Sequence, residues 1–410
     1  MNPYLVFILF VLVGSFIIRC LGDVLNIRNS KNHIPQEFVG VYDTDLYQKS
    51  QTYLKENTVF CLVSSGVFLA VQVMFICLGG FDSVDRLARS FSLSHIPTGM
   101  IFALSCFFLY QIVSLPFSVY RTFILEEKYG FNRTKAKTFI GDLVKGWVLV
   151  FFLGGLIWSI LLWLFGALGD KAWAVCWGVV AVYELFIMTI APGLILPLFN
   201  KFQPLEAGEL KDSIEAYAKE QDFRINGIFV MDGSRRSTKT NAFFTGFGRY
   251  RRIVLFDTLI QNHSVDELVS VLAHEVGHYK RRHIQKHLAL SIAIMGIMFY
   301  LMGIFMNHQG LFDAFRMTHT SIYAGIFFFA YLYVPFAFFI GILENALSRK
   351  HEYEADAFAC RTRKNKESMG TALKKLAKDN LSNLTPHPLK IWLEYSHPPI
   401  LARLKHIEEL

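Results

Sequence analysis

The chain has 410 residues, of which 53% are hydrophobic and only 18% are charged. Its mean hydropathy is positive, at +0.35, which is typical of a membrane protein and argues against a soluble globular enzyme. The formal charge is +8, but no basic motif interleaved with aromatic residues is present, so the charge does not indicate nucleic-acid binding. We attribute it to attraction to an anionic membrane surface.

Seven apolar stretches are each close to the roughly 20 residues that a helix needs to cross a bilayer. We therefore predict a mainly α-helical, multi-pass membrane protein. The stretches are residues 4–21, 58–80, 97–120, 147–168, 172–199, 287–306 and 321–343. The sixth has the least distinct start, and we expect it to continue the helix that precedes it.

The first stretch has an alternative interpretation as a cleaved signal peptide. No Lys or Arg precedes residues 4–21, and no small-residue cleavage site follows Leu21, so we expect a retained helix.

Charged side chains within or beside later spans, namely Arg121, Glu184 and Glu344, are costly in lipid. They either face a protein or water-filled interior or extend toward the membrane surface.

Lys and Arg residues are distributed unevenly between the connections. The connections after spans one, three and five hold 4, 6 and 14 of them, and the tail after span seven holds 12. The other three connections hold 2, 1 and 1. Because basic residues accumulate on the cytoplasmic side, we predict an N-terminus outside and a C-terminus in the cytoplasm.

The spans divide the chain into four parts. Residues 1–200 contain five spans, residues 201–286 form a polar region, residues 287–343 contain spans six and seven, and residues 344–410 form a second polar region. The short connection 307–320 predicts antiparallel neighbours for the last two spans, so both polar regions lie on the same side. Residues 225–231 and 252–256 are typical of short strands, which predicts a small β-sheet in the first polar region.

Residues 274–278 read His-Glu-Val-Gly-His, which is HExxH, the zinc-protease motif. Because a helix turns once in 3.6 residues, His274 and His278 project from one face and can bind one metal ion. Glu275 lies beside the metal, where it can take a proton from the attacking water and pass it to the leaving amine. The motif alone could belong to an ordinary surface helix. Apolar residues at helical spacing and a capping box formed by Ser264 and Glu267 predict that an amphipathic helix carries it.

A catalytic zinc ion usually has three protein ligands and leaves one position for water, so a third donor is expected downstream. The best candidate is Glu352, which shares a helix face with Asp356 at i, i+4 spacing. Asp356 could accept the free ring N–H of a ligand histidine. Glu354 points away from that face, and we expect it to be solvated. Taken alone, this segment would also suit an ordinary charged helix.

With these residues in place, the chain resembles the type I CAAX prenyl protease family of integral-membrane zinc metalloproteases over nearly its whole length. The resemblance is carried by residues 274–278, Ser348-Arg349 with Glu352, Ala355-Asp356, Asn241-Ala242-Phe243, and residues 395–399 with Arg403. It implies helices that enclose a water-filled chamber with a cytoplasmic zinc site at one end. It also implies His274, His278 and Glu352 as zinc ligands, Glu275 as general base and Asp356 as the residue that supports a ligand.

The resemblance further implies residues that bind the substrate. Asn241 and Ala242 would lie on an edge strand that pairs with the substrate backbone, a common way to hold an extended peptide. His397 and Arg403 would hold the substrate or its developing oxyanion. Judged without the family, Asn241 is nearly as well explained as a turn residue, and His397 is better explained as a structural loop histidine.

We therefore predict a zinc-dependent endopeptidase with one Zn²⁺ per chain. The resemblance implies removal of the last three residues from isoprenylated CAAX proteins, so peptide or protein substrates and membrane lipid are the expected partners. The sequence does not define an oligomeric state. Alternatives are a broad quality-control protease for membrane proteins, a seven-span transporter or receptor, and an inactive scaffold. The length of the chain and its short outer connections favour a bacterial inner membrane over the endoplasmic reticulum membrane.

Overall fold

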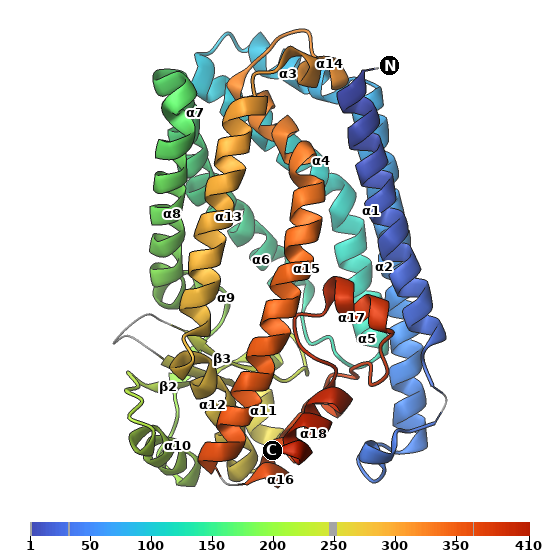
Figure 1. The fold of residues 1–410 in the computed structure, drawn as a ribbon, viewed down its shortest axis with the longest axis vertical. Helices are drawn as coiled ribbons and strands as arrows, with labels where there is room; N and C mark the ends of the chain where they lie inside the picture. Colours follow the sequence, from blue (N-terminus) through green and yellow to red (C-terminus); the bar gives the residue numbers. More distant parts are fainter. Residues whose placement is uncertain (1, 32, 246–251, 364) are drawn as a thin grey trace.

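The structure is a computed structural model that describes residues 2–31, 33–245, 252–363 and 365–410. Within these residues, seven helical segments are long and apolar enough to cross a membrane, which confirms the predicted seven-span architecture. They run along the long axis of the molecule (Figure 1). The segments are Pro3–Arg28 (α1), Thr44–Cys77 (α2), His95–Lys128 (α4 and α5), Ala136–Leu168 (α6 and α7), Ala172–Phe199 (α8 and α9), His283–Phe305 (α13) and Ile322–Arg363 (α15).

Three of the spans contain a five-residue π-helical turn. In each case the turn joins two α-helices into one continuous span. The third turn contains Pro192, which has no backbone N–H to donate within the helix. The turns are Arg121–Leu125 between α4 (His95–Tyr120) and α5 (Glu126–Lys128), Val150–Gly154 between α6 (Ala136–Leu149) and α7 (Gly155–Leu168), and Ala191–Ile195 between α8 (Ala172–Ile190) and α9 (Leu196–Phe199).

Side chains of the spans are sparsely buried. In the most apolar part of each span, between 0% and 22% of the residues are buried inside the protein. A helix packed in a solid core typically buries a stripe roughly 100° wide or wider along its length. Most side chains of the spans therefore face either the surrounding lipid or an interior that the helices enclose.

Two short helices close one end of the bundle, which we call the α3 end. They are α3 (Gly80–Ser90) and α14 (Gln309–Ala314), both at the top of Figure 1. They share an apolar core with the spans. In this core the rings of Phe315 and Phe328 stack with their centroids 3.9 Å apart. The packed core of the membrane region is therefore concentrated at this end.

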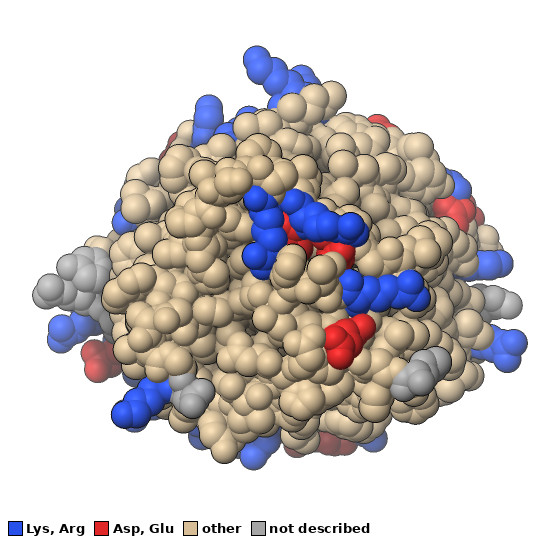
Figure 2. Space-filling view, turned by 90° about the horizontal axis from the view of Figure 1, so that it is seen from above, with Lys and Arg blue, Asp and Glu red and all other residues tan. Residues whose placement is uncertain are grey.

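A buried carboxylate links the helices of the α3 end. Asp85 is fully buried and accepts hydrogen bonds from the Tyr323 hydroxyl of α15 and from Arg89 Nε. These partners offset the cost of removing the carboxylate from water. Figure 2 views the molecule from this end, where some Lys and Arg side chains gather with acidic ones in a small central group. This end carries the three connections with only 2, 1 and 1 basic residues.

The polar region before α12 forms a four-stranded sheet in the order β1-β2-β4-β3. The central β2 and β4 pair in parallel, and the two outer pairs are antiparallel. The predicted sheet is therefore present, and β3 forms one edge of it. The strands are β1 (Phe202–Pro204), β2 (Ile228–Met231), β3 (Ala242–Thr245) and β4 (Arg252–Phe256). A shared apolar core joins the sheet to α10 (Glu209–Glu220), α11 (Asp257–Asn262) and α12 (Val265–Lys280).

The motif helix α12 begins as predicted and ends earlier than expected. Ser264 and Glu267 form the capping box, each side chain accepting a hydrogen bond from the backbone N–H of the other residue. The expectation that span six continues this helix is wrong. Arg282 has a φ of 56°, and this left-handed conformation interrupts the helix. A separate helix, α13, then starts at His283.

Span seven and the second half of the site belong to one long helix. α15 (Ile322–Arg363) has 42 residues, and its polar part, residues 344–363, contains no Gly or Pro, so the helix continues beyond the apolar stretch. Three further helices surround its end: α16 (Lys366–Asp379), α17 (Pro388–Glu394) and α18 (Ile400–Glu409).

α12 lies close against α15 at Gly277, inside the HExxH motif. A Cβ atom at this position would lie 3.1 Å from Ala355 Cα and 3.2 Å from the Ala355 carbonyl oxygen. Backbone atoms of a buried helix cannot move aside as a flexible side chain can. The absence of a side chain at residue 277 therefore sets the distance between the two helices that carry the site.

We expect Gly277→Ala to destabilise the protein by about 1–3 kcal/mol, because the added methyl group pushes α15 away from α12. Thermal unfolding in detergent measures the effect as a lower midpoint. Gly341→Ala is the matched control, since a Cβ at Gly341 of α15 meets nothing within 4 Å. Equal midpoints for the two variants would contradict the assignment of Gly277 as the spacer.

Candidate metal centre

Three side chains converge on a candidate metal site: His274 and His278 of α12, and Glu352 of α15. One ligand atom from each lies within 4.8 Å of the others. The two histidine Nε2 atoms are 3.1 Å apart. The Glu352 carboxylate oxygens lie 3.4 Å from His274 Nε2 and 3.2 Å from His278 Nε2. The three residues expected to be zinc ligands are thus brought together by the fold.

Asp356 lies behind the ligands, one helical turn after Glu352. Its Oδ1 accepts a hydrogen bond from His274 Nδ1 at 2.8 Å. This bond keeps a proton on Nδ1 and directs the Nε2 lone pair toward the site. Burial alone would lower the pKa of His274, but the hydrogen bonds to Asp356 and Glu352 outweigh burial and raise the pKa to about 9. The same negative surroundings attract a metal cation.

Arg403 of α18 is buried, whereas a side chain that binds substrate would be exposed at the site. It is only 6% exposed. Its Nε and one terminal nitrogen donate to the two Asp356 oxygens at 2.9 Å and 2.6 Å, and its other terminal nitrogen lies 3.3 Å from Glu352 Oε2. The guanidinium therefore holds the two carboxylates of α15 and ties the last helix to the site.

The chemistry of these residues fits a divalent cation such as Zn²⁺. Two imidazoles and a carboxylate make a ligand set typical of catalytic zinc. Glu352 Oε2 is buried, and in the described part of the chain its partners are the longer ion-pair contacts with His274 and Arg403, at 3.4 Å and 3.3 Å. Three carboxylates, those of Glu275, Glu352 and Asp356, influence one another and the single guanidinium of Arg403. When ionised, they leave two negative charges that a divalent cation would neutralise.

Glu275 lies between the ligands and the free edge of the sheet. It borders a narrow crevice that Ala242 and Phe243 of β3 also line. Burial raises the pKa of Glu275, which suits a general base that works near neutral pH. Asn241 is the exposed residue directly before β3, and its side-chain oxygen accepts a hydrogen bond from the Ala242 N–H. The predicted edge strand is therefore beside the predicted base.

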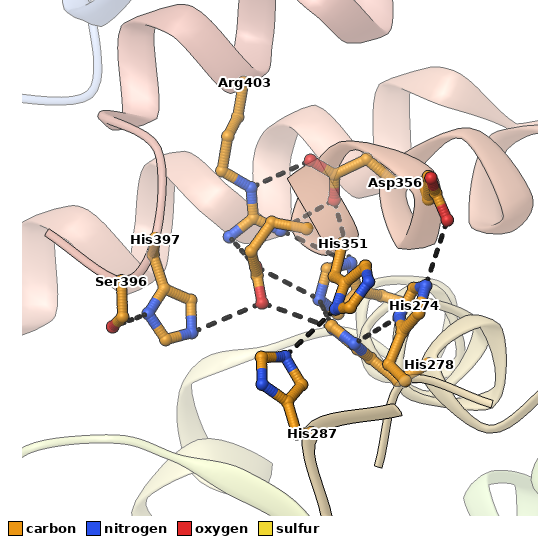
Figure 3. Close-up of polar contacts among 11 residues, drawn as sticks. His274, His278, His287, His351, Asp356, Ser396, His397 and Arg403 are labelled. Atoms are coloured by element: carbon orange, nitrogen blue, oxygen red, sulfur yellow. Dashed lines mark hydrogen bonds and ion pairs between the residues drawn. The ribbon is translucent and has the colours of Figure 1, made fainter. Parts of the chain in front are cut away.

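His397 lies at the opening of the site. Its side chain is 65% exposed, and its Nε2 is 3.4 Å from Glu352 Oε1. In Figure 3 it approaches from the side opposite His274. Arg349 of α15 donates to the carbonyl oxygens of Ile391 and Tyr395, and so secures the end of α17 just before His397.

Three further histidines surround the site, and sequence reasoning missed them. His283 Nδ1 is 3.0 Å from His278 Nδ1, and His351 Nδ1 is 3.0 Å from His287 Nε2. Glu354, which we expected to be solvated, is 31% exposed and also accepts a hydrogen bond from His283 Nε2 at 3.1 Å. A signal was present, since residues 278–287 contain three histidines.

Comparisons with known proteins follow the same division of the chain. Residues 23–201 match the family described as CAAX prenyl protease N-terminal, five membrane helices, and residues 204–410 match peptidase family M48. The relatives include the probable CAAX prenyl protease 1 of Schizosaccharomyces pombe, 34% identical, with 89% of this chain and 80% of the relative covered. The CAAX prenyl protease 1 homolog of Mus musculus is 31% identical, with 93% and 90% covered.

A solved structure extends the agreement to three dimensions. The crystal structure of Saccharomyces mikatae Ste24p matches with a TM-score of 0.95 at 31% sequence identity, and 100% of each chain is covered. The fold, the paired family matches and the ligand set lead to one assignment. The chain belongs to peptidase family M48, in its membrane-embedded CAAX prenyl protease group.

Proposed function

We propose that this membrane metalloendopeptidase binds one Zn²⁺ through His274, His278 and Glu352 and uses Glu275 as its general base. The observation that carries the proposal is the convergence of the three ligand atoms beside Glu275 at the free edge of β3. When bound, Zn²⁺ polarises the scissile carbonyl and acidifies water. Glu275 accepts the proton of the attacking water and returns it to the leaving amine.

Substrate binding follows from the surroundings of Glu275. We assign the outer edge of β3, beginning at Asn241 and Ala242, to backbone pairing with an extended peptide. His397, exposed at the opening, contacts the substrate or its developing oxyanion. Arg403 supports this centre through Asp356 and Glu352, and its burial makes it a positioning residue. The polar regions 201–286 and 344–410 act as one catalytic unit, since α12 packs directly on α15.

The substrate class rests on the family and on the membrane setting. We propose C-terminal processing of prenylated CAAX proteins, because the relatives are named for that activity. Membership of a peptidase family with every ligand in place leaves the transporter, receptor and scaffold alternatives without support. A broad protease for membrane proteins is the competing substrate class, and peptide preference separates the two.

We place the catalytic unit on the cytoplasmic side, because the connections at its end of the bundle carry most of the Lys and Arg residues. The organisms of the relatives, Schizosaccharomyces pombe and Mus musculus, are eukaryotes. Their eukaryotic origin favours the endoplasmic reticulum membrane over the bacterial inner membrane, which the length of the chain had favoured.

The first test compares the wild type with Glu275→Gln, purified in detergent. We expect near-stoichiometric zinc in both and loss of most turnover in Glu275→Gln, because the base is gone while the ligands remain. His278→Ala is the control that loses zinc as well. Substrates are a prenylated CAAX peptide and its unprenylated twin, with the released tripeptide as the readout. Equal cleavage of the twins would favour the broad protease, and absence of zinc from the wild type would overturn the metal assignment.

Asp356→Asn tests the support of the ligands. We expect zinc affinity to fall by roughly 10- to 100-fold, because the neutral side chain holds the Nδ1 proton of His274 less firmly. Competition with a zinc chelator measures the affinity. Asp379→Asn, at the end of α16 where its partner is Asn262, is the control that leaves zinc binding intact. Wild-type affinity in Asp356→Asn would remove Asp356 from this role.

Glycosylation tests the orientation. Arg316→Asn creates an Asn-Met-Thr acceptor in the connection between spans six and seven, at a position whose φ of 56° Asn tolerates. On expression into endoplasmic reticulum membranes we expect one glycan on this variant and none on the wild type. The natural acceptors at Asn132, Asn262, Asn380 and Asn383 would face the cytoplasm. Glycans on the wild type at those residues would reverse the proposed orientation.

A further inference from the structure

Each histidine ligand has a partner on the nitrogen that faces away from the site. His274 Nδ1 is held by Asp356. His278 Nδ1 faces a different partner, His283 Nδ1, at 3.0 Å. His283 is 2% exposed, and Figure 3 labels two further histidines, His351 and His287, beside the two ligand histidines. The second ligand therefore relies on another imidazole where the first relies on a carboxylate.

The contact with Glu354 determines which nitrogens of His283 and His278 carry protons. An ionised carboxylate only accepts hydrogen bonds, so the contact between Glu354 Oε2 and His283 Nε2, at 3.1 Å, requires a proton on that Nε2. A neutral His283 then has a lone pair on Nδ1. Because that nitrogen can only accept, His278 must carry its own proton on Nδ1. Its Nε2 is left with the lone pair that a metal needs.

The opposite assignment would close the site to a metal. If His283 carried its proton on Nδ1, it would donate to His278 Nδ1, and His278 would keep its proton on Nε2. That nitrogen lies 3.1 Å from His274 Nε2 and 3.2 Å from Glu352 Oε1, at the centre of the ligand set. A proton there occupies the position of the metal. Glu354 prevents this arrangement, because its contact with His283 keeps the proton of that imidazole on Nε2.

The fold positions His283 for this task. The left-handed residue Arg282 ends the motif helix and starts α13 with His283, which turns the imidazole back toward His278. The ring of His351 stacks on it with centroids 3.9 Å apart and planes 9° from parallel. His351 in turn lies 3.0 Å from His287. His283 is therefore fixed by stacking as well as by its two polar contacts.

We propose that His283 and Glu354 are positioning residues that select the metal-binding tautomer of His278. The inference rests on the proposed zinc site and adds two residues to it. We call the pair the His283–Glu354 relay. Neither residue touches the substrate, so the relay acts on zinc retention first and on turnover only through zinc.

The test uses variants that separate the acceptor from the bulk of the ring. His283→Phe keeps a ring that stacks on His351 but removes the acceptor. His283→Asn places an amide oxygen near the position of Nδ1 and so restores an acceptor. Glu354→Ala removes the anchor of the tautomer, while Glu354→Gln retains an oxygen that can accept from Nε2. His287→Gln is the matched control, because it alters the branch of the cluster that does not contact His278.

Zinc affinity is measured on the purified full-length chain by chelator competition, and the absorption spectrum of the Co²⁺-substituted protein reports the ligand geometry. We expect His283→Phe to weaken zinc binding by roughly 10- to 100-fold and to change the Co²⁺ spectrum. His283→Asn, Glu354→Gln and His287→Gln should stay near the wild type, with Glu354→Ala in between.

Three results would overturn the relay while leaving the proposed function intact. One is wild-type zinc affinity in His283→Phe. Another is equal weakening in His283→Phe and His283→Asn, which would indicate a purely steric role. The third is wild-type affinity in Glu354→Ala, which would remove Glu354. A wild type that binds no zinc would instead overturn the proposed function itself.

Discussion

The site depends on the close packing of α12 against α15, where Gly277 meets the backbone of Ala355. In the proposed mechanism, one helix supplies two ligands and the base, and the other supplies the third ligand and the carboxylate behind it. Neither helix contains a complete site. Because protein interiors are densely packed, the distance at this crossing fixes the distance between His278 and Glu352. The metal chemistry is therefore a consequence of helix packing as much as of the motif.

Burying so many charges together requires that each have a partner. Isolated carboxylates and guanidinium groups are costly to remove from water, and removing one partner of a buried group leaves the other uncompensated. Arg403 reduces this cost for Asp356 and Glu352 and draws α18 against the end of α15. The proposed divalent cation would neutralise the remaining negative charge. Metal binding and the packing of the C-terminal helices are thus linked through the same carboxylates.

The sequence alone predicted the features that depend on residues close together in the chain. Apolar stretches of membrane length predicted all seven spans, and the capping box at Ser264 predicted the start of the motif helix. The spacing within HExxH and between Glu352 and Asp356 predicted the ligand set that the fold brings together. Each of these signals lies within one continuous segment of the chain, where geometry follows directly from the helical period.

Features that depend on contacts between distant residues were not predictable in this way. The left-handed Arg282 separates α12 from α13, and no Gly or Pro marks that break in the sequence. His283 and Glu354 are separated by 71 residues, so their pairing appears only when α13 lies beside α15. Arg403 similarly looked free to bind a substrate until its two carboxylate partners were placed. Polar side chains are the least predictable part of the site, because their partners come from other helices.

The position of the site along α15 limits how a lipid-bearing substrate can reach it. Glu352 lies nine residues beyond the apolar stretch that ends at Leu343, which is roughly 13 Å along a helix. Headgroups occupy about 5–7 Å on each side of the bilayer core, so an α15 that crosses the bilayer upright and leaves the core at Leu343 would carry Glu352 just beyond the headgroups. A lipid carried several residues from the scissile bond could stay in the bilayer while an extended peptide spanned this distance. A lipid on the residue next to the scissile bond could not stay in the bilayer during cleavage. It must leave the bilayer core or enter the interior of the helical bundle. If the substrate is a prenylated cysteine, the helical bundle therefore needs an interior that the lipid can enter, or a path by which the lipid leaves the bilayer.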